Sequence, residues 1–274
     1  NRRNIKDSKL SDSEIITISI VGELLTIDSE KSFFSLLKRE YKELFPRLGD
    51  RTRFNRTKRN LHLVISKIRG YISEFMQLYS NNVRVIDSMP IPVCEFGRAR
   101  FSKCFKGEAS YGRCASKKET YFGFKFHALT TVDGFLTDYV ITPANIDDRN
   151  AVWDLCDKYR SISIIGDKGY INKRLTPELK SERDIDLLFL KRANSRDNYP
   201  KEVRQLLFKV RRRIETSFSQ LTEQLNLNKV KSKSMLGFIT RTSIKVLAHN
   251  ISFLINKLMR NDDSMAKIKR LVFG

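Results

Sequence analysis

The sequence predicts a mixed α/β fold, in which a five-stranded mixed sheet is flanked by helices and preceded by an all-helical N-terminal domain. Three observations lead to this prediction. Apolar residues recur at helical spacing over residues 1–80, the period shortens to that of strands from residue 83, and strand-like runs then alternate with helical stripes. We therefore expect a helical domain at 1–80 and an α/β domain at 81–274 that ends in helices.

The N-terminal region carries clear helix signals. Ser11 and Glu14 have the spacing of a capping box, in which each side chain accepts a hydrogen bond from the other residue's backbone N–H. A longer helix is expected over residues 61–79, and a run of bases stands at its start: Arg51, Arg53, Arg56, Lys58 and Arg59. Almost no acids intersperse this run, so contact with a DNA backbone is favoured over a solvated helix face.

Five β-prone runs follow, at residues 83–86, 121–131, 135–142, 162–165 and 185–190. In the second run, three phenylalanines alternate with small or basic residues, as in a strand with two different faces. Asp133–Gly134 is a tight-hairpin signal, so the second and third runs should pair antiparallel. Helical segments precede the last two runs, which fits a mixed sheet. A basic loop, residues 95–120, separates the first two runs.

Pro200 opens the clearest helix of the chain, because apolar residues follow it at steps of three and four. This inner stripe consists of Val203, Leu207, Val210, Ile214, Phe218, Leu221 and Leu225. Glu215 lies one position beyond the stripe residue Ile214, at an edge from which its side chain can reach the sheet. A last helix carries Leu236, Ile239, Leu247, Ile251, Leu254 and Leu258.

The charge balance indicates a polyanionic partner. The 274 residues include 52 Lys and Arg against 31 Asp and Glu, a formal net charge of +21. Double-stranded DNA fits this charge better than a membrane surface, since no basic helix also carries the aromatic and leucine face of interfacial helices. No apolar run is long enough to span a bilayer, and no apolar core follows Asn1–Asn4 as in a signal peptide. The first residue is Asn, so we expect a few residues to precede it.

Four cysteines stand at positions 94, 104, 114 and 156. The ten-residue steps between Cys94, Cys104 and Cys114 do not match zinc sites, where ligand pairs lie two to four residues apart. We therefore expect free thiols in a reducing cytosol, and the sequence assigns no role to these three residues.

Three acidic residues form the candidate catalytic set. Asp87 and Asp167 each follow a short strand-like run, and Glu215 follows three consecutive arginines on the long helix. Taken singly, either aspartate reads equally well as a turn former, and Glu215 as a surface ion pair. Taken together, three carboxylates from two strand ends and a helix can hold divalent metal beside a phosphodiester. Arg211, one turn before Glu215, would either neutralise it or contact the scissile phosphate.

Further basic residues are candidate DNA contacts. Those of the basic loop and those near the acids are Arg98, Arg100, Lys103, Lys106, Lys125, His127, Lys168, Arg211 and Arg212. For Lys125 and His127 the alternative interpretation is an ordinary polar strand face.

The chain resembles the DDE-type bacterial insertion-sequence transposases, and most closely insertion-sequence family 982. The segments that carry the resemblance are Ile86–Pro92, Tyr121–His127, Gly166–Tyr170 and Arg213–Ser219, with Leu10–Glu14 and Phe45–Leu48 nearer the N-terminus. It covers nearly the whole chain. Its order and spacing are specific, because 167 − 87 = 80 and 215 − 167 = 48 residues separate the three acids.

The resemblance implies an RNase H-like catalytic core and a helical DNA-binding head. It implies Asp87, Asp167 and Glu215 as ligands of two Mg²⁺ ions, for which Mn²⁺ can substitute. It further implies cleavage at the terminal inverted repeats of a mobile element and attack of the freed 3′-hydroxyl on target DNA. A homodimer on DNA, in the bacterial cytoplasm at the nucleoid, is the expected working form.

The chain departs from the related larger transposase group at two positions. Phe208 stands where that group often has Tyr, and Thr222 where it often has Lys. A phosphate contact from that Lys is therefore not expected here. Two other functions stay open on the sequence alone: a metal-dependent nuclease that performs no strand transfer, and a catalytically silent DNA-binding relative.

Overall fold

The computed structural model describes residues 9–78, 81–114, 118–170, 172, 174–190, 199–259 and 266–268, without the side chain of Lys168. The chain divides into two compact units. One is Ser73–Gln220, and the other combines Asn1–Ile72 with Leu221–Gly274. The C-terminal segment thus groups with the N-terminal helices, whereas the expected division at residues 80 and 81 assigned it to the α/β domain.

The Ser73–Gln220 unit is built on one six-stranded mixed sheet. Its strands are β1 (Val83–Pro92), β2 (Ser110–Cys114), β3 (Glu119–Thr130), β4 (Leu136–Pro143), β5 (Ser163–Gly166) and β6 (Asp186–Phe189). β1 pairs antiparallel with β3 and parallel with β5, and β5 pairs parallel with β6. β2 and β4 both pair with β3, along successive parts of it.

The five expected strands are present, and the mixed α/β fold is confirmed as consistent with an RNase H-like fold. The additional strand, β2, lies inside the expected basic loop 95–120. It alternates half-buried and exposed residues, a weak pattern beside the phenylalanines of β3.

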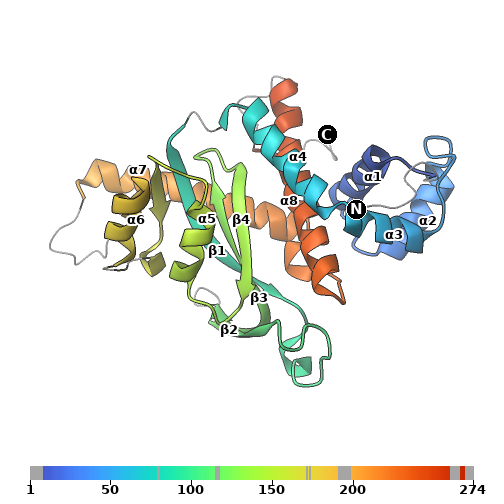
Figure 1. Cartoon of the computed structure of the whole chain (residues 1–274), viewed down its shortest axis with the longest axis horizontal. Helices are drawn as coiled ribbons and strands as arrows, with labels where there is room; N and C mark the ends of the chain where they lie inside the picture. The colour runs from blue at the N-terminus through green and yellow to red at the C-terminus, as the bar shows by residue number, and fades with distance from the viewer. Residues whose placement is uncertain are drawn as a thin grey trace. The chain divides into compact units, whose positions relative to one another are not determined.

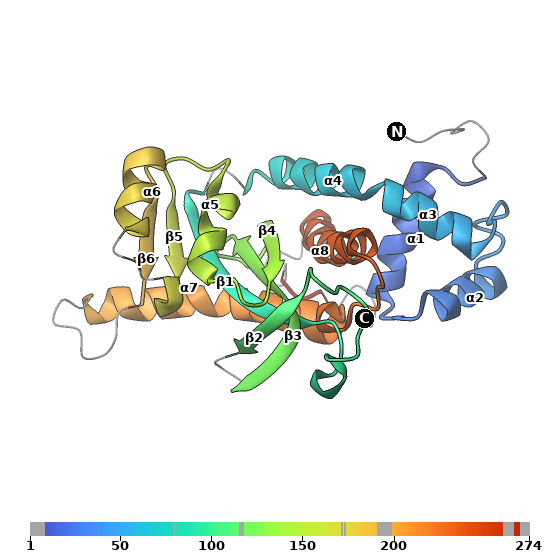
Figure 2. The same cartoon turned by 60° about the horizontal axis from the view of Figure 1, so that its bottom comes forward.

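Helices cover both faces of this sheet. α5 (Ala151–Cys156) and α6 (Leu175–Arg183) lie on one side of the strands, and α7 (Lys201–Ser219) lies on the other (Figures 1 and 2). Neighbouring residues of β5 show the division, because Ile164 packs in the cluster formed with α5 and α6, while Ile165 packs with Leu207 of α7. Successive residues of β5 therefore point to opposite faces of the sheet, one covered by α5 and α6 and the other by α7.

A turn between β3 and β4 helps to fix α7. Gly134 has φ 97°, a conformation that favours glycine, and its N–H donates to the Thr131 carbonyl at 3.0 Å. The Gly134 carbonyl accepts a hydrogen bond from the Ser217 hydroxyl at 2.7 Å. Ring contact between Phe126 and Phe218, with centroids 6.2 Å apart, holds the same end of α7 on the sheet.

The second unit is helical. Its helices are α1 (Asp12–Leu24), α2 (Glu30–Glu40), α3 (Arg51–Asn60), most of α4 (His62–Phe75) and α8 (Met235–Leu258). The capping box of Ser11 and Glu14 is present at the start of α1. The single helix expected over 61–79 starts at His62, ends at Phe75 and is separated from the basic α3 by Leu61. No helix among the described residues is long and apolar enough to cross a bilayer.

A buried charged group joins α1 to α8. The Lys245 ammonium donates to the Glu23 carboxylate at 2.5 Å and to the Leu225 carbonyl, and the Arg241 Nε donates to the same carboxylate at 3.2 Å. Removing Glu23 would leave two buried cations without this partner, a change that typically costs about 3–5 kcal/mol. This network fixes the first half of α8 against α1.

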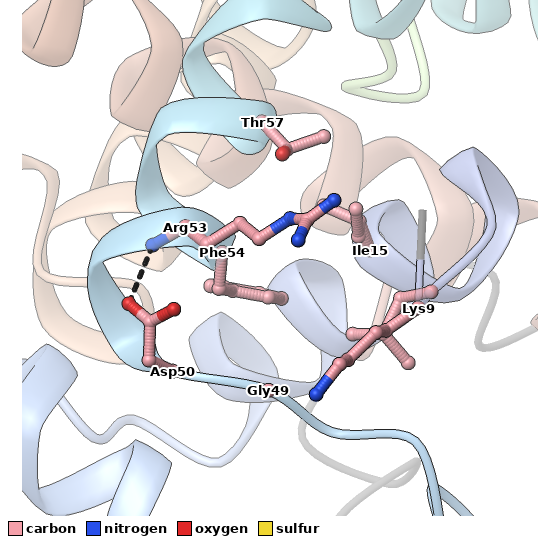
Figure 3. Close-up of a pocket in the computed structure, with 8 residues that line it drawn as sticks. Lys9, Ile15, Gly49, Asp50, Arg53, Phe54 and Thr57 are labelled. Carbon is pink, nitrogen blue, oxygen red and sulfur yellow. Dashed lines mark hydrogen bonds between the residues drawn. The ribbon is translucent and has the colours of Figure 1, made fainter. Parts of the chain in front are cut away.

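The start of α3 is capped by an aspartate. The Arg53 N–H donates to the Asp50 carboxylate at 2.9 Å (Figure 3). The Arg53 side chain runs toward Ile15 of α1, and Lys9 lines the same small cavity (Figure 3). Lys9 and Arg53 are therefore two bases that line one cavity at this end of α3.

Candidate active site

Strand register brings two of the three acids to the same level of the sheet. β1 and β5 pair in parallel with Val85 opposite Ile165, and Asp87 and Asp167 each stand two residues further on. Because side chains alternate between faces, Asp87 and Asp167 share the face on which Ile165 meets α7. Gly166 permits this approach, since a Cβ there would lie 2.9 Å from the Ile86 Cγ2.

The third acid comes from α7, which covers that face. The Arg211 guanidinium lies among all three carboxylates. Its Nη2 is 3.2 Å from Glu215 Oε1, 3.7 Å from Asp87 Oδ2 and 3.8 Å from Asp167 Oδ2. Acids from β1, from the end of β5 and from α7 thus converge on one cation, and we call these four residues the acidic cluster.

The three acids differ in burial. The Asp87 side chain is 19% exposed, against 43% for Asp167 and 51% for Glu215. Burial raises the pKa of Asp87 to about 6, and the nearby Asp167 and Glu215 also raise it. The Ser88 backbone N–H, which donates to Asp87 Oδ1 at 2.8 Å, and the Arg211 guanidinium act in the opposite direction. The cluster therefore holds more negative charge than its surroundings compensate, which favours added cations.

A polar network lies on the opposite face of β1, behind Asp87. Asp148 Oδ1 accepts from the Lys125 ammonium at 2.8 Å, and Asp148 Oδ2 accepts from the Ser88 hydroxyl at 3.1 Å. The His127 Nδ1 is 3.9 Å from the same carboxylate. Asp148 was not among the candidate site residues of the sequence, and its neighbour Asp147 caps the following turn. The sequence did carry one signal for this network: the alternation of β3 places Lys125 and His127 on the same face of the strand.

Lys125 and His127 were candidate DNA contacts, and the structure places both in this network. The Lys125 ammonium also donates to the Ile146 carbonyl at 2.8 Å. The His127 side chain is 0% exposed, and burial lowers its pKa to about 4, so the ring is neutral at neutral pH. Both side chains point away from the face that carries the Asp87 carboxylate, and neither lies beside the acidic cluster.

The other candidate DNA contacts differ in exposure. Arg51, Arg53 and Arg56 of α3 are exposed, Arg59 is half-buried, and Lys58 is buried in an ion pair with Glu30. In the basic loop the exposed candidates are Arg98, Arg100, Lys103 and Lys106. Arg212 is exposed on α7, while the Lys168 side chain lies outside the described residues.

All four cysteines are free thiols, as expected. Cys156 is buried, whereas Cys94, Cys104 and Cys114 are half-buried. Among the described residues, no group of three or more His, Cys, Asp or Glu side chains is arranged as a metal would hold them. In the acidic cluster, the Arg211 guanidinium supplies the positive charge about which the carboxylates gather.

Comparison with known proteins identifies the family. A family described as a transposase DDE domain matches residues 77–235, which is more than half of the chain. The chain belongs to this family. Residues 77–235, which match the transposase domain, contain the six strands of the sheet, α7 and the three acids. No curated protein and no solved structure matches the chain. Membership of insertion-sequence family 982 stays a prediction.

The donor set of the transposase domain suits the divalent metal ions that DDE transposases generally use. Three carboxylates supply the hard oxygen ligands that Mg²⁺ and Mn²⁺ prefer. A guanidinium already lies among them, so the position favours a cation in this structure. Asp87, Asp167 and Glu215 stay the predicted ligands of such ions.

Proposed function

We propose that this chain is a transposase that cuts DNA at the ends of an insertion sequence and joins the freed 3′-hydroxyl to target DNA. The observation that supports this most is the convergence of Asp87, Asp167 and Glu215 on the Arg211 guanidinium. It occurs inside a transposase DDE domain, on the face of the sheet that α7 covers.

Each residue has a distinct part in this proposal. Asp87, enclosed on β1, is the fixed ligand, while the more exposed Asp167 and Glu215 face the side from which DNA would approach. Two Mg²⁺ ions, for which Mn²⁺ substitutes, would activate the attacking oxygen and stabilise the leaving one. With the carboxylates engaged by these ions, Arg211 would be available to bind a phosphate of the DNA backbone.

The proposal also names the working form of the protein. The partners are double-stranded DNA at the element's terminal inverted repeats and at the target, and the site of action is the bacterial cytoplasm at the nucleoid. A homodimer is the proposed form, because two ends of one element have to be joined. The exposed bases of α3 and of the basic loop would bind the DNA backbone.

A strand-joining assay tests this function. The substrate is a duplex that carries a terminal repeat of the element with a pre-cleaved 3′-hydroxyl, mixed with supercoiled target plasmid and Mg²⁺. The proposal predicts covalently joined products that require the metal and the 3′-hydroxyl. Hydrolysed DNA with no joined product would instead indicate a nuclease, and intact DNA with normal binding a silent relative.

A further inference from the structure

A polar cavity of about 180 Å³ lies in the helical unit, where α2 and α3 meet the segment before α8 and its first turns. Two other cavities of this unit hold only about 20 Å³ each. The larger one is lined by charged and hydroxyl side chains, including Ser232, Ser234 and Thr240. A cavity of this size and polarity is filled by water or by a polar ligand.

The cavity lining carries a large excess of positive charge. Five of its side chains are cationic, namely Lys58, Arg59, Lys231, Lys233 and Arg241, and one, Glu30, is acidic. Two of the cations are compensated, since Lys58 pairs with Glu30 and Arg241 pairs with Glu23 at 3.2 Å.

The other three cations have no such compensation. In the part of the chain that the structure describes, no carboxylate lies within ion-pair distance of Arg59, Lys231 or Lys233. Three like charges around one cavity repel each other, although Lys231 and Lys233 are exposed to solvent. An anion bound in the cavity would relieve this repulsion.

The start of α8 adds to this positive potential. Ser234 caps the helix by accepting from the Gly237 N–H at 3.3 Å, and 24 helical residues follow. The end of a helix that exposes N–H groups attracts anions. A Cβ at Gly237 would lie 2.6 Å from the Ser232 hydroxyl, so the segment with Lys231 and Lys233 packs closely against this helix start.

We propose that this cavity holds one phosphate of the DNA backbone, bound by Arg59, Lys231 and Lys233. The proposal rests on the proposed function for the identity of the anion. The basic α3 supports DNA over a free anion, since its exposed Arg51 and Arg56 lie on the helix that delivers Arg59 to the cavity. Such a contact positions the duplex and reads no base sequence.

The salt dependence of DNA binding tests this site. Affinity for a fluorescent duplex is measured by anisotropy over a series of NaCl concentrations, for the wild type and for Lys231→Gln/Lys233→Gln. Removing one phosphate contact reduces the slope of log K against log salt by about 1. The double variant should therefore lower the slope by about 1, because one phosphate is released.

Two controls locate the effect. Lys31→Gln/Lys42→Gln removes the same charge from exposed lysines of the same unit, outside the cavity, and should leave the slope unchanged. Ser232→Asp keeps every cation and adds a carboxylate to the lining, so it should lower the slope by about 1, whereas Ser232→Asn should not. The lysine pair decides the test if Ser232→Asp fails to fold.

Three outcomes would overturn the proposal. They are an unchanged slope in Lys231→Gln/Lys233→Gln, an equal fall in the Lys31→Gln/Lys42→Gln control, and equal effects of Asp and Asn at position 232. Each leaves the proposed function standing if the wild type still cuts and joins DNA through its carboxylates. Wild-type binding with no salt dependence would contradict DNA backbone contact in both proposals.

Discussion

The acidic cluster and the cavity lined by Lys58, Arg59, Lys231, Lys233 and Arg241, here called the basic cavity, each bring like charges together, but with opposite sign. In the cluster, three carboxylates surround one guanidinium, which leaves a formal charge of 1 − 3 = −2. In the cavity, five cations face one carboxylate, which leaves 5 − 1 = +4 before Glu23 is counted as a partner of Arg241. Each site lacks charge of one sign, and we propose metal cations as the partner of the first site and phosphate as the partner of the second.

The two sites also differ in how their charges are balanced within the protein. The cluster has an internal counter-ion, Arg211, within 3.8 Å of every acid. In the cavity, the buried cations are paired and the cations nearer solvent, Lys231 and Lys233, are not. We infer that the cluster is organised before its ligand binds, whereas the cavity is completed by its ligand.

The largest effect is expected from the carboxylates. Asp87→Asn, Asp167→Asn and Glu215→Gln should each reduce cleavage by about 10³-fold or more, because each removes one of the proposed metal ligands. DNA binding should stay intact. Glu202→Gln, an exposed acid at the start of α7, is the matched control and should cut normally. Gel analysis of cleaved DNA with parallel binding measurements distinguishes the two activities. Full cleavage by any one variant would remove that residue from the set.

The basic face of α3 should give the next largest effect. Replacing Arg51, Arg53, Arg56 and Arg59 by Gln is expected to weaken duplex binding and to lower its salt slope by up to about 4, one for each phosphate released. A slope equal to that of the wild type would take α3 out of the DNA interface. Cleavage chemistry at saturating protein should change far less than binding.

Arg211 provides a test of the cluster's internal balance. Arg211→Met should destabilise the metal-free protein by about 2 kcal/mol, since three neighbouring carboxylates then repel without a counter-ion. Thermal unfolding in EDTA should reveal this loss, and Mn²⁺ should restore more stability to Arg211→Met than to the wild type. Arg211→Lys keeps the positive charge, so its melting temperature in EDTA should lie between those of Arg211→Met and the wild type. An unchanged melting temperature in EDTA would argue against the counter-ion role.

Acid should affect His249 and Asp87 with opposite sign. His249 of α8 is fully buried, and burial lowers its pKa to about 4, so its stabilising contribution is present above pH 6.5 and is lost as the pH falls toward 4. Asp87, with its raised pKa, behaves inversely: its cost to the metal-free fold is relieved as the pH falls through about 6. His249→Gln should therefore reduce the loss of stability between pH 6.5 and 5.5 by about 1 kcal/mol, measured by urea unfolding.

Much of this arrangement could be predicted from the sequence, because local pattern and strand register carry it. Periodicity predicts the alternation of β3 and the inner stripe of α7. It also predicts that Asp87 and Asp167 share a face with Val85 and Ile165. The exception on α7 is Val203, which the stripe predicted to be buried and which is 41% exposed. The helix is less covered near its start than its apolar pattern suggests.

What the sequence missed depends on contacts between distant segments. Asp148 approaches Ser88 and Lys125 only because the turn before α5 returns across the sheet face. The basic cavity combines α3 with a segment that starts 172 positions after Arg59, at Lys231 (231 − 59 = 172). No local period links such residues, so neither group was visible before the fold was known.

Binding of Mn²⁺ to the protein with duplex DNA, followed by electron paramagnetic resonance, tests the central claim most directly. The claim is that Asp87, Asp167 and Glu215 together hold the divalent ions of a DNA-cutting site. We predict that the wild type removes free Mn²⁺ from solution, and that Asp87→Asn/Asp167→Asn/Glu215→Gln does so much more weakly while Glu202→Gln behaves like the wild type. Equal Mn²⁺ binding by the triple variant and the wild type would contradict the claim.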